Sequence, residues 1–492
     1  MGSIKKEKTV RYIWYAIIFA FMFIWFSKVH PLVPFDGDDW GHLSFARRAV
    51  PELTQWNPAK LFPEIFMSVT CTIAAFTIAP ITGDYIGAIT IMSAFVTSGF
   101  ITVYIHCFSE CLKRIFKVSS NHSILIEALF LILHFLIFRQ GDSDNTYLLY
   151  CIDLNCYYNY LLPALLNASL VLFMIKNDKM DALQNNGLFY VAIYFAIFSN
   201  LVDSIILTVY AGSMLICNFV KQAKCKFNWK KCMKSNRIYF LIIVFWGISA
   251  VFELSGGRAA LAAADTTPFL EKILAVLKGT VVVFSWMHKM FILLAGALVL
   301  GAFALWIAEK EKKELEDSFL KQVLFWGLMI FVTIIYTVVI CAKVSVGNIY
   351  RSEYLFALFF FVLVALMFCL AYILRKKPKA VVLLPLGLCI LSTYINTNLH
   401  TFKESNYLNV SGKLCMQMSK DLVNEMIEAD KAGKTDIELK VSLSGQDANW
   451  PQSYAMGDSM AITLYKHGIV SRMLDVTIVP SEEYNNRYQI YQ

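Results

Sequence analysis

The feature that most constrains this chain is a series of apolar stretches, each about 18 to 23 residues long and almost free of charge. That is the length an α-helix needs to cross a hydrocarbon core about 30 Å thick. Because 58% of the 492 residues are hydrophobic and only 16% are charged, a water-soluble protein could not bury so much apolar surface. The sequence therefore predicts a mainly α fold, a polytopic transmembrane helical bundle.

We expect about eleven membrane spans, by length and hydropathy. The first is interpreted as a retained span and not as a signal peptide, because no A-x-A-like cleavage site follows it. Residues 62–80 are also apolar; we expect them to be re-entrant or membrane-embedded, and the alternative is that they cross while 187–220 forms a single span. The predicted spans are 11–29, 84–106, 123–138, 158–175, 187–200, 201–220, 238–254, 287–308, 320–342, 354–374 and 380–396.

The net charge of +8 indicates membrane topology and not a nucleic-acid partner, because Lys and Arg cluster in short loops between the apolar stretches. By the positive-inside rule these loops face the cytoplasm, together with the N-terminus. They are 5–8, 113–117, 221–237, 310–321 and 375–379. The other loops, at about 30–60, 139–157, 255–286 and 343–353, then face outward, as does everything after about 396. The predicted location is the cell membrane.

The one break in composition lies near Asn396, where the apolar stretches end. We therefore expect a transmembrane domain over 1–395 and a small extracytoplasmic α/β domain over 396–492. In the second domain the patterns predict a helix over 411–430, a strand over 436–443, a helix over 457–467 that stops at Gly468, and a strand over 474–479.

An acidic cluster lies in the first outward loop, where the sequence is Asp36-Gly37-Asp38-Asp39-Trp40. Carboxylates this close raise one another's pKa, so Asp38, Asp39 or Asp36 could act as a general base. A pair such as Asp36 and Asp38 also suits a hard divalent cation, Mg²⁺ or Mn²⁺. The structural alternative is that Asp38 or Asp39 caps the helix that follows.

A second outward loop offers acids and aromatic rings in the pattern expected of a carbohydrate site. Asp142 and Asp144 would bind sugar hydroxyls, and Tyr157, Tyr158 and Asn159 would line the same site. The alternative for the tyrosines is an interfacial aromatic belt, which does not explain the acids.

Two outward arginines, Arg258 and Arg351, suit a phosphate or pyrophosphate group, because a guanidinium can form paired hydrogen bonds to it. Each could instead anchor a helix end by reaching to the membrane surface. The chain has no Walker loop and no Rossmann glycine pattern, so nothing in it is built to hydrolyse a cytosolic nucleotide.

Together, the acidic motif Asp36-Gly37-Asp38-Asp39-Trp40 after the first span, the second acidic loop, the outward arginines and the polar tail resemble the GT-C superfamily of membrane glycosyltransferases. The most similar members are bacterial enzymes that decorate cell-surface polysaccharides with a sugar from a polyprenyl-phosphate carrier. The resemblance covers the layout of most of the chain, but its specific motif is that acidic sequence alone. Residues 62–80 depart from the family, which has a plain second span there.

The resemblance implies a role for each candidate residue. Asp38 or Asp39 would activate the acceptor hydroxyl, and Asp36 would assist or help to hold a metal. The residues expected to contact the sugar or the carrier phosphate are Asp142, Asp144, Arg258 and Arg351.

These observations predict a membrane glycosyltransferase that moves a sugar from a polyprenyl-phosphate-linked donor to a surface glycan acceptor, on the outer face of the membrane. Its partners would be membrane lipid, this donor and this acceptor, with no nucleic acid. The alternatives are a transporter or flippase for a lipid-linked sugar, and a polysaccharide polymerase or ligase.

Overall fold

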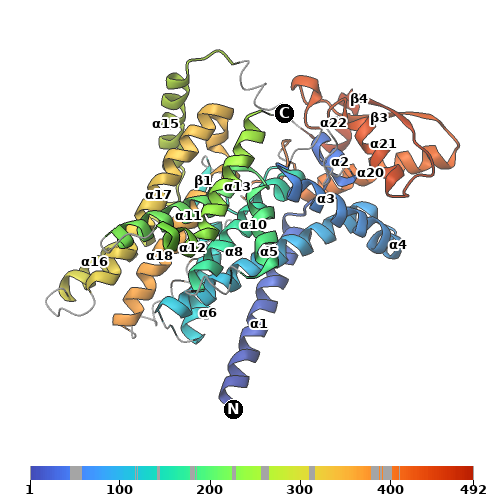
Figure 1. The fold of residues 1–492 in the computed structure, drawn as a ribbon. Coiled ribbons are helices and arrows are strands. Elements are labelled where there is room, and N and C mark those ends of the chain that lie inside the picture. The colour runs from blue at the N-terminus through green and yellow to red at the C-terminus, as the bar shows by residue number, and fades with distance from the viewer. Residues whose placement is uncertain are drawn as a thin grey trace.

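A computed structural model of the chain shows a bundle of long helices with a smaller domain seated at one end (Figure 1). The N-terminus of α1 lies at the opposite end of the bundle. The structure describes residues 2–44, 58–116, 118, 120–140, 144–177, 183, 185–223, 229–255, 265–309, 316–377, 387, 391, 402–408 and 410–490.

Nine helices within the described ranges are long and apolar enough to cross a membrane. Each coincides with a predicted span or with the segment 62–80, and we conclude that the chain is a multi-pass membrane protein. They are Glu7–Val29, Leu61–Thr82, Tyr85–Phe116, Leu154–Lys176, Leu201–Gln222, Arg237–Leu254, Lys289–Ala308, Phe319–Val344 and Ser352–Lys376.

Three of the eleven predicted spans are not among these nine. The segments 123–138 and 187–200 form shorter helices, α6 (Ser120–Phe135) and α10 (Gly187–Ile197). The segment 380–396 lies outside the described residues apart from two positions. The count of eleven therefore stays a prediction.

The first half of the bundle contains α1 (Gly2–Ile24), η1 (Trp25–Val29), α2 (Gly37–Ser44), α3 (Leu61–Ile73), η2 (Ala74–Ile78), α4 (Ala79–Thr82), α5 (Tyr85–Phe116), α6, β1 (Phe138–Gln140), β2 (Asp144–Thr146), α7 (Leu154–Cys156), η3 (Tyr157–Leu161), α8 (Leu162–Lys176) and α10. The second half contains α11 (Leu201–Ala223), α12 (Trp229–Ser235), α13 (Arg237–Leu254), α15 (Phe269–Ser285), α16 (Lys289–Glu309), α17 (Glu316–Val344), η5 (Val346–Tyr350) and α18 (Ser352–Lys376). The strands β1 and β2 form an antiparallel pair.

The helices differ in how much of their surface is covered. The span of α18 is 83% buried, whereas that of α16 is only 17% buried. A helix that is apolar on all sides and covered by its neighbours belongs to the interior, and an apolar helix that stays uncovered is suited to lipid. α18 is therefore a central helix of the bundle and α16 a peripheral one.

Two charge pairs, one buried and one partly exposed, link helices near the predicted basic loops. Arg11 on α1 contacts Glu127 on α6 at 3.2 Å, and Lys176 on α8 contacts Glu110 on α5 at 3.3 Å. Removing one partner of such a pair would leave an uncompensated charge. The predicted cytoplasmic loops next to these helices thus lie at one end of the bundle.

The C-terminal domain (residues 411–490) is the α/β unit that the sequence predicts. The strands β3 (Asp436–Ser442) and β4 (Asp475–Ser481) pair in parallel, and α21 (Met456–Lys466) connects them as a crossover helix. α20 (Gly412–Lys431) precedes this unit and α22 (Glu482–Tyr488) follows it. Gly468 has φ +68°, which glycine adopts without strain, so the chain turns there as predicted.

The C-terminal domain packs directly on the first loop and on α3 (Figure 1). Thr463 donates to the carbonyl of Trp40 at 2.8 Å, and His467 bonds Tyr85 at 2.8 Å and Thr72 at 3.2 Å. Asp84, at the start of α5, pairs with Lys420 at 2.6 Å. The domain therefore contacts α3 and the α4–α5 turn along their length.

Gly457 sets how closely α21 can approach β4. A Cβ at this position would meet the backbone oxygen of Val476, which cannot move without disturbing the strand. Overpacking of this kind costs about 1–3 kcal/mol. We expect Gly457→Ala to destabilise the C-terminal domain by about that amount, measured as earlier cleavage by a protease on heating the full chain in detergent. Asp458→Ala, at the exposed neighbouring position, is the control and should unfold near the wild-type temperature.

A buried acidic site between two loops

Asp36 and Asp39 start helix α2 by capping each other's backbone. The Asp39 N–H donates to Asp36 Oδ1 at 3.0 Å, and the Asp36 N–H donates to Asp39 Oδ2 at 3.4 Å. This reciprocal pair is a capping box, and it satisfies two amides that the helix leaves unpaired. The predicted capping role therefore belongs to Asp36 with Asp39, while Asp38 is exposed to solvent.

Asp39 also ties the first loop to a distant part of the chain. Its Oδ2 accepts from the Phe35 N–H at 2.9 Å, and its Oδ1 accepts from the Asn155 N–H at 2.6 Å. Asn155 belongs to α7, which lies within the second predicted outward loop, 139–157. The two loops are thus joined through one fully buried carboxylate.

Asp153 enters the same site by capping α7. Its Oδ1 accepts from the Cys156 N–H at 2.5 Å, and its Oδ2 lies 3.2 Å from the Cys156 thiol. α7 continues through η3 into α8, so the position of Asp153 is fixed at the end of a long bundle helix.

Asp36, Asp39 and Asp153 form one buried cluster, which we call the acidic triad. Ligand oxygens of the three residues lie within 4.8 Å of one another. Asp36 Oδ2 is buried without a hydrogen-bond partner, and among the described residues no Lys, Arg or His forms an ion pair with the triad. A buried carboxylate oxygen with no partner is costly unless a proton or a cation neutralises the group.

The pKa of each of the three acids is raised above its ordinary value. Burial raises the pKa of Asp36 and of Asp39, and nearby negative charge, that of Asp153 included, raises both further. Burial also raises the pKa of Asp153, to about 6, although its bonds from Cys156 and the charge of Arg351 oppose the shift.

The triad fits a hard divalent cation by its chemistry. Three carboxylates offer only oxygen atoms, the ligands that Mg²⁺ and Mn²⁺ prefer, and the unpartnered Asp36 Oδ2 has a free lone pair for such an ion. The structure brings Asp39 and Asp153 to Asp36, whereas Asp38 of the predicted metal pair is exposed, so a metal held by Asp36 and Asp38 stays a prediction.

Arg351 lies behind the triad and is held by neighbours of its own. Its Nε donates to Glu353 at 2.7 Å, its Nη2 lies 3.3 Å from the Cys156 sulfur, and its guanidinium rests on the rings of Tyr160 and Tyr354. Because Cys156 also contacts Asp153, Arg351 is linked to the acidic triad through one thiol. An arginine so engaged is suited to positioning these residues.

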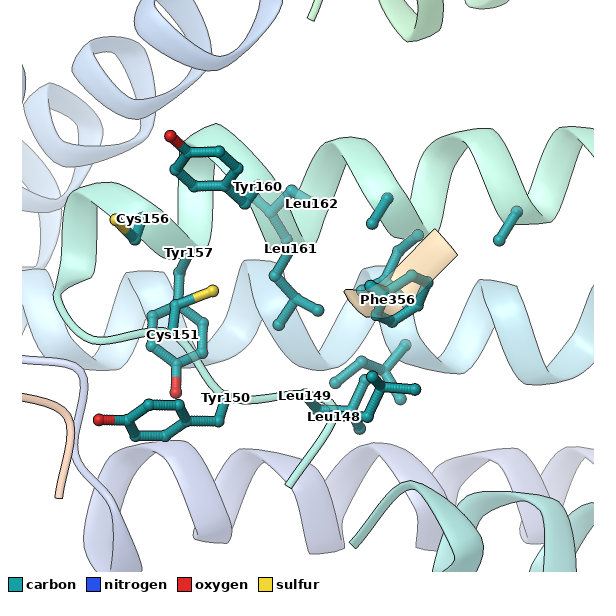
Figure 2. Packing of buried hydrophobic residues seen from close by; sticks show 14 of the residues in the cluster. Leu148, Leu149, Tyr150, Cys151, Cys156, Tyr157, Tyr160, Leu161, Leu162 and Phe356 are labelled. Carbon is teal, nitrogen blue, oxygen red and sulfur yellow. The ribbon is translucent and has the colours of Figure 1, made fainter. Parts of the chain in front are cut away.

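Tyr157, Tyr158 and Asn159 are buried and do not present open faces to a sugar. Tyr157 bonds Ser405 at 3.2 Å, Tyr158 bonds Thr70 at 3.0 Å, and Asn159 donates to the carbonyl of Asn155 at 3.1 Å. Figure 2 shows how this segment packs beside Leu148–Cys151 and Phe356, with the two cysteine sulfurs pointing apart. These residues therefore support the acidic triad from inside the bundle.

The structure does not describe the side chains of the remaining predicted site residues. Asp142 and Arg258 lie outside the described residues. Asp144 is in β2, opposite Gln140, and its side chain is not described.

The residue that the sequence reasoning missed is Asp153. It stands three residues before Cys156, at the start of a helix, which is the spacing of a helix cap. That signal marks a cap but does not say that the cap contacts a loop more than 110 residues away.

A pocket that opens between α11, α13 and α17 lies on the other side of η3. Its floor is apolar, and its polar lining comes from two lysines, two tyrosines, Asn200 and Glu253. Asn200 donates to the carbonyl of Asn159 and to Asp203. Asn159 in turn bonds Asn155, the residue that holds Asp39. The pocket is therefore connected to the acidic triad by hydrogen bonds. It is lined by Lys60, Tyr160, Asn200, Leu201, Val202, Glu253, Leu254, Ile340, Lys343, Val344 and Tyr354.

Comparison with known proteins adds no relative: no family model matches the chain, no curated protein is similar to it, and no solved structure matches it.

Cation binding should stabilise the protein more at neutral than at acidic pH. The folded-state pKa of Asp153, about 6, is above that of an unfolded Asp, about 3.9, so the empty triad loses stability as pH rises through this window. Mn²⁺ at about 100 times its Kd would stabilise the fold by about 2.7 kcal/mol. We expect a larger Mn²⁺-dependent rise in Tm at about pH 7.5 than at about pH 5, because fewer protons then compete with the cation.

Two variants test this assignment. Asp153→Asn should abolish the Mn²⁺ effect, whereas Asp38→Asn, in the same loop but exposed, should keep it. Equal effects of Mn²⁺ on the wild type and on Asp153→Asn would contradict a cation site at the triad.

Proposed function

We propose that the chain is a membrane glycosyltransferase that moves a sugar from a polyprenyl-phosphate-linked donor to a surface glycan on the outer face of the membrane. The observation that carries the proposal is the acidic triad, because it sits at the boundary between the bundle and the C-terminal domain, where a lipid-linked donor and a soluble glycan can meet. The buried Asp36 Oδ2, which has no partner, is the group that most requires a ligand.

The chemistry assigns different tasks to the exposed and the buried acids. The acceptor oxygen attacks the anomeric carbon of the donor, the bond from that carbon to the phosphate oxygen breaks, and the phosphate leaves with the electron pair. Asp38, which is exposed beside the triad, takes the proton of the acceptor hydroxyl. Asp36, Asp39 and Asp153 would hold a divalent cation. When bound, such a cation supplies positive charge near the leaving phosphate.

The pocket lined by Lys60 and Lys343 supports a donor that arrives through the membrane. Its apolar floor suits a hydrocarbon chain, and its lysines suit a phosphate at the level of the head groups. Leu254 and Val344, at its rim, are 55% and 40% exposed, as expected of positions that face lipid. Arg351, whose contacts are internal, would act from behind the acidic triad.

The contacts of the C-terminal domain also support the extracytoplasmic side for this site. Basic loops flank the opposite end of the bundle, where Arg11 and Lys176 lie, and such loops face the cytoplasm. The domain rests on α3 and on the α4–α5 turn, from Thr72 to Asp84. We expect the segment 62–80, which the domain contacts at Thr72, to be re-entrant or membrane-embedded.

One observation favours the alternative function, a transporter for a lipid-linked sugar. A second, apolar pocket lies at the basic end of the bundle, between α5, α16, α17 and α18. In a transporter, which opens alternately to each side of the membrane, this pocket would serve the lipid on the side opposite the first pocket. Purified protein in vesicles separates the two functions, because a transporter would relocate a labelled lipid-linked sugar without changing it.

Replacing the acids should stop the modification of the surface glycan. In a deletion strain complemented with Asp36→Asn or Asp38→Asn, we expect the decorating sugar to fall by about 100-fold or more and the lipid-linked donor to accumulate. The measurements are monosaccharide analysis of the surface glycan and mass spectrometry of the lipid fraction. Glu428→Gln, at an exposed position of the C-terminal domain, is the control. An unchanged glycan in both acidic variants, at normal protein levels, would rule the function out.

Lys343 provides a separate test of the donor pocket. Lys343→Ala should raise the KM for the lipid-linked donor by about tenfold, and Lys343→Arg should restore most of it, because a phosphate contact depends on the positive charge. Lys289→Ala, an exposed lysine at the start of α16, should leave the KM unchanged. An equal effect of both alanine variants would mean that Lys343 only adds to the general surface charge.

A further inference from the structure

Two aromatic side chains beside the acidic triad have no part in the proposed chemistry. They are Tyr407, in the segment before the C-terminal domain, and Trp450, in the loop between β3 and α21. Their ring centroids are 5.8 Å apart and the rings meet at 80°. Tyr407 is 44% exposed and Trp450 is partly exposed, so solvent reaches both rings.

Trp450 lies against the acidic motif at Gly37, and Tyr407 packs on Trp450. A Cβ on Gly37, which stands between Asp36 and Asp38, would be 3.8 Å from Trp450 Cζ3. The Tyr407 hydroxyl has its pKa raised by burial and then by the negative charge of Asp153, with a smaller effect of Asp36. Gly37 thus brings Trp450 to the acidic motif, next to the exposed Asp38.

The loop that carries Trp450 is fixed by its own hydrogen bonds. Asn449 accepts from the Ser444 N–H at 3.0 Å and donates to the carbonyls of Ser442 and Gln452, each at 2.9 Å. The Pro451 carbonyl accepts from the Gly37 N–H at 3.1 Å, which holds the loop against the acidic motif.

The backbone before Trp450 is strained. Ala448 and Asn449 have φ of 51° and 57°, a region that costs a residue with a side chain about 1–2 kcal/mol. Strain of this kind persists where the surroundings enforce it, and it gathers at ligand-binding loops. The loop therefore holds a partly exposed tryptophan in one place, against Gly37 of the acidic motif.

We propose that Trp450 and Tyr407 form a platform that binds a sugar ring of the acceptor glycan and holds its hydroxyl beside Asp38. Sugar rings combine an apolar C–H face, which packs on an aromatic ring, with hydroxyls that bond to carboxylates and to a tyrosine hydroxyl. The platform belongs to the solvent side of the acidic triad, whereas the donor pocket opens between bundle helices. The assignment to the acceptor rests on the proposed function.

The test measures binding of a defined probe to the full-length protein in nanodiscs. The probe is a set of short oligosaccharides released by mild acid from the surface polysaccharide of the host cell, and the method is saturation-transfer difference NMR. We expect transfer to ring C–H protons with the wild type and with Asp36→Asn. Trp450→Ala should weaken binding by about fivefold to tenfold, the size of one aromatic contact, and Trp450→Phe by less.

Tyr454→Ala is the matched control, because Tyr454 lies in the same loop and is 59% exposed but is not paired with Tyr407. It should bind the oligosaccharides like the wild type. Absence of transfer with the wild type, wild-type affinity in Trp450→Ala, or an equal loss in Tyr454→Ala would overturn the platform. A normal Tm of Trp450→Phe together with reduced binding excludes loss of folding as the cause.

The outcomes separate the platform from the proposed function. If the decorating sugar depends on Asp36 but no oligosaccharide binds, the platform is wrong and the transferase stands. If the oligosaccharides bind through Trp450 but Asp36→Asn leaves the glycan unchanged, the chain binds glycan without transferring a sugar.

Discussion

The structure depends on one buried carboxylate, that of Asp39, which accepts backbone N–H groups from two parts of the chain. Phe35 and Asp36 come from the first loop and Asn155 comes from the start of the helix that becomes α8. These bonds favour the ionised carboxylate, whereas burial and the neighbouring Asp153 favour the protonated one. The hydrogen bonds that hold the two loops together thus bury negative charge, which a bound cation would neutralise.

The C-terminal domain fixes the other side of the first loop. Ser419 donates to the carbonyl of Pro34 at 2.7 Å, and the Gly37 N–H donates to the carbonyl of Pro451 at 3.1 Å. The acidic motif therefore lies between the bundle and the domain and belongs to neither alone. The segment before the domain strengthens this link, because Phe402 packs on Trp25 and Tyr147 inside the bundle. The predicted boundary near 396 marks a change in amino-acid composition, but the parts of the chain on its two sides contact each other.

Much of the fold could be predicted because the length of each apolar stretch and the residues that cap helices can be recognised within a short part of the sequence. The described spans up to residue 374 are mainly helical, and the sequence predicts the bounds of both strands and of two of the three helices of the C-terminal domain within two residues. The acidic motif was also recognised from the sequence, but its partner was placed at Asp142 or Asp144. Asp153 joins the site through a contact between residues more than 110 positions apart, and no local pattern encodes such a contact. Arg351, which the sequence assigns to a phosphate, pairs instead with Glu353, only two residues away in the sequence.

The surroundings of the acidic triad make its members unequal. Arg351 lies on the side of Asp153 and lowers its pKa, while Asp36 faces Asp39, Asp153 and Asp38 and has an oxygen without a partner. Asp153 is therefore the acid that ionises most readily, whereas the pKa values of Asp36 and Asp39 are both raised well above the usual range. Where the environments of neighbouring acids separate their pKa values, one acid can act as a proton donor and the other as a base. When the acids interact this strongly, the observed pKa values describe the cluster as a whole and not one residue. A cation can displace a proton that these buried oxygens share. A proton and a bound cation are therefore two alternative ways to neutralise the negative charge of the acidic triad.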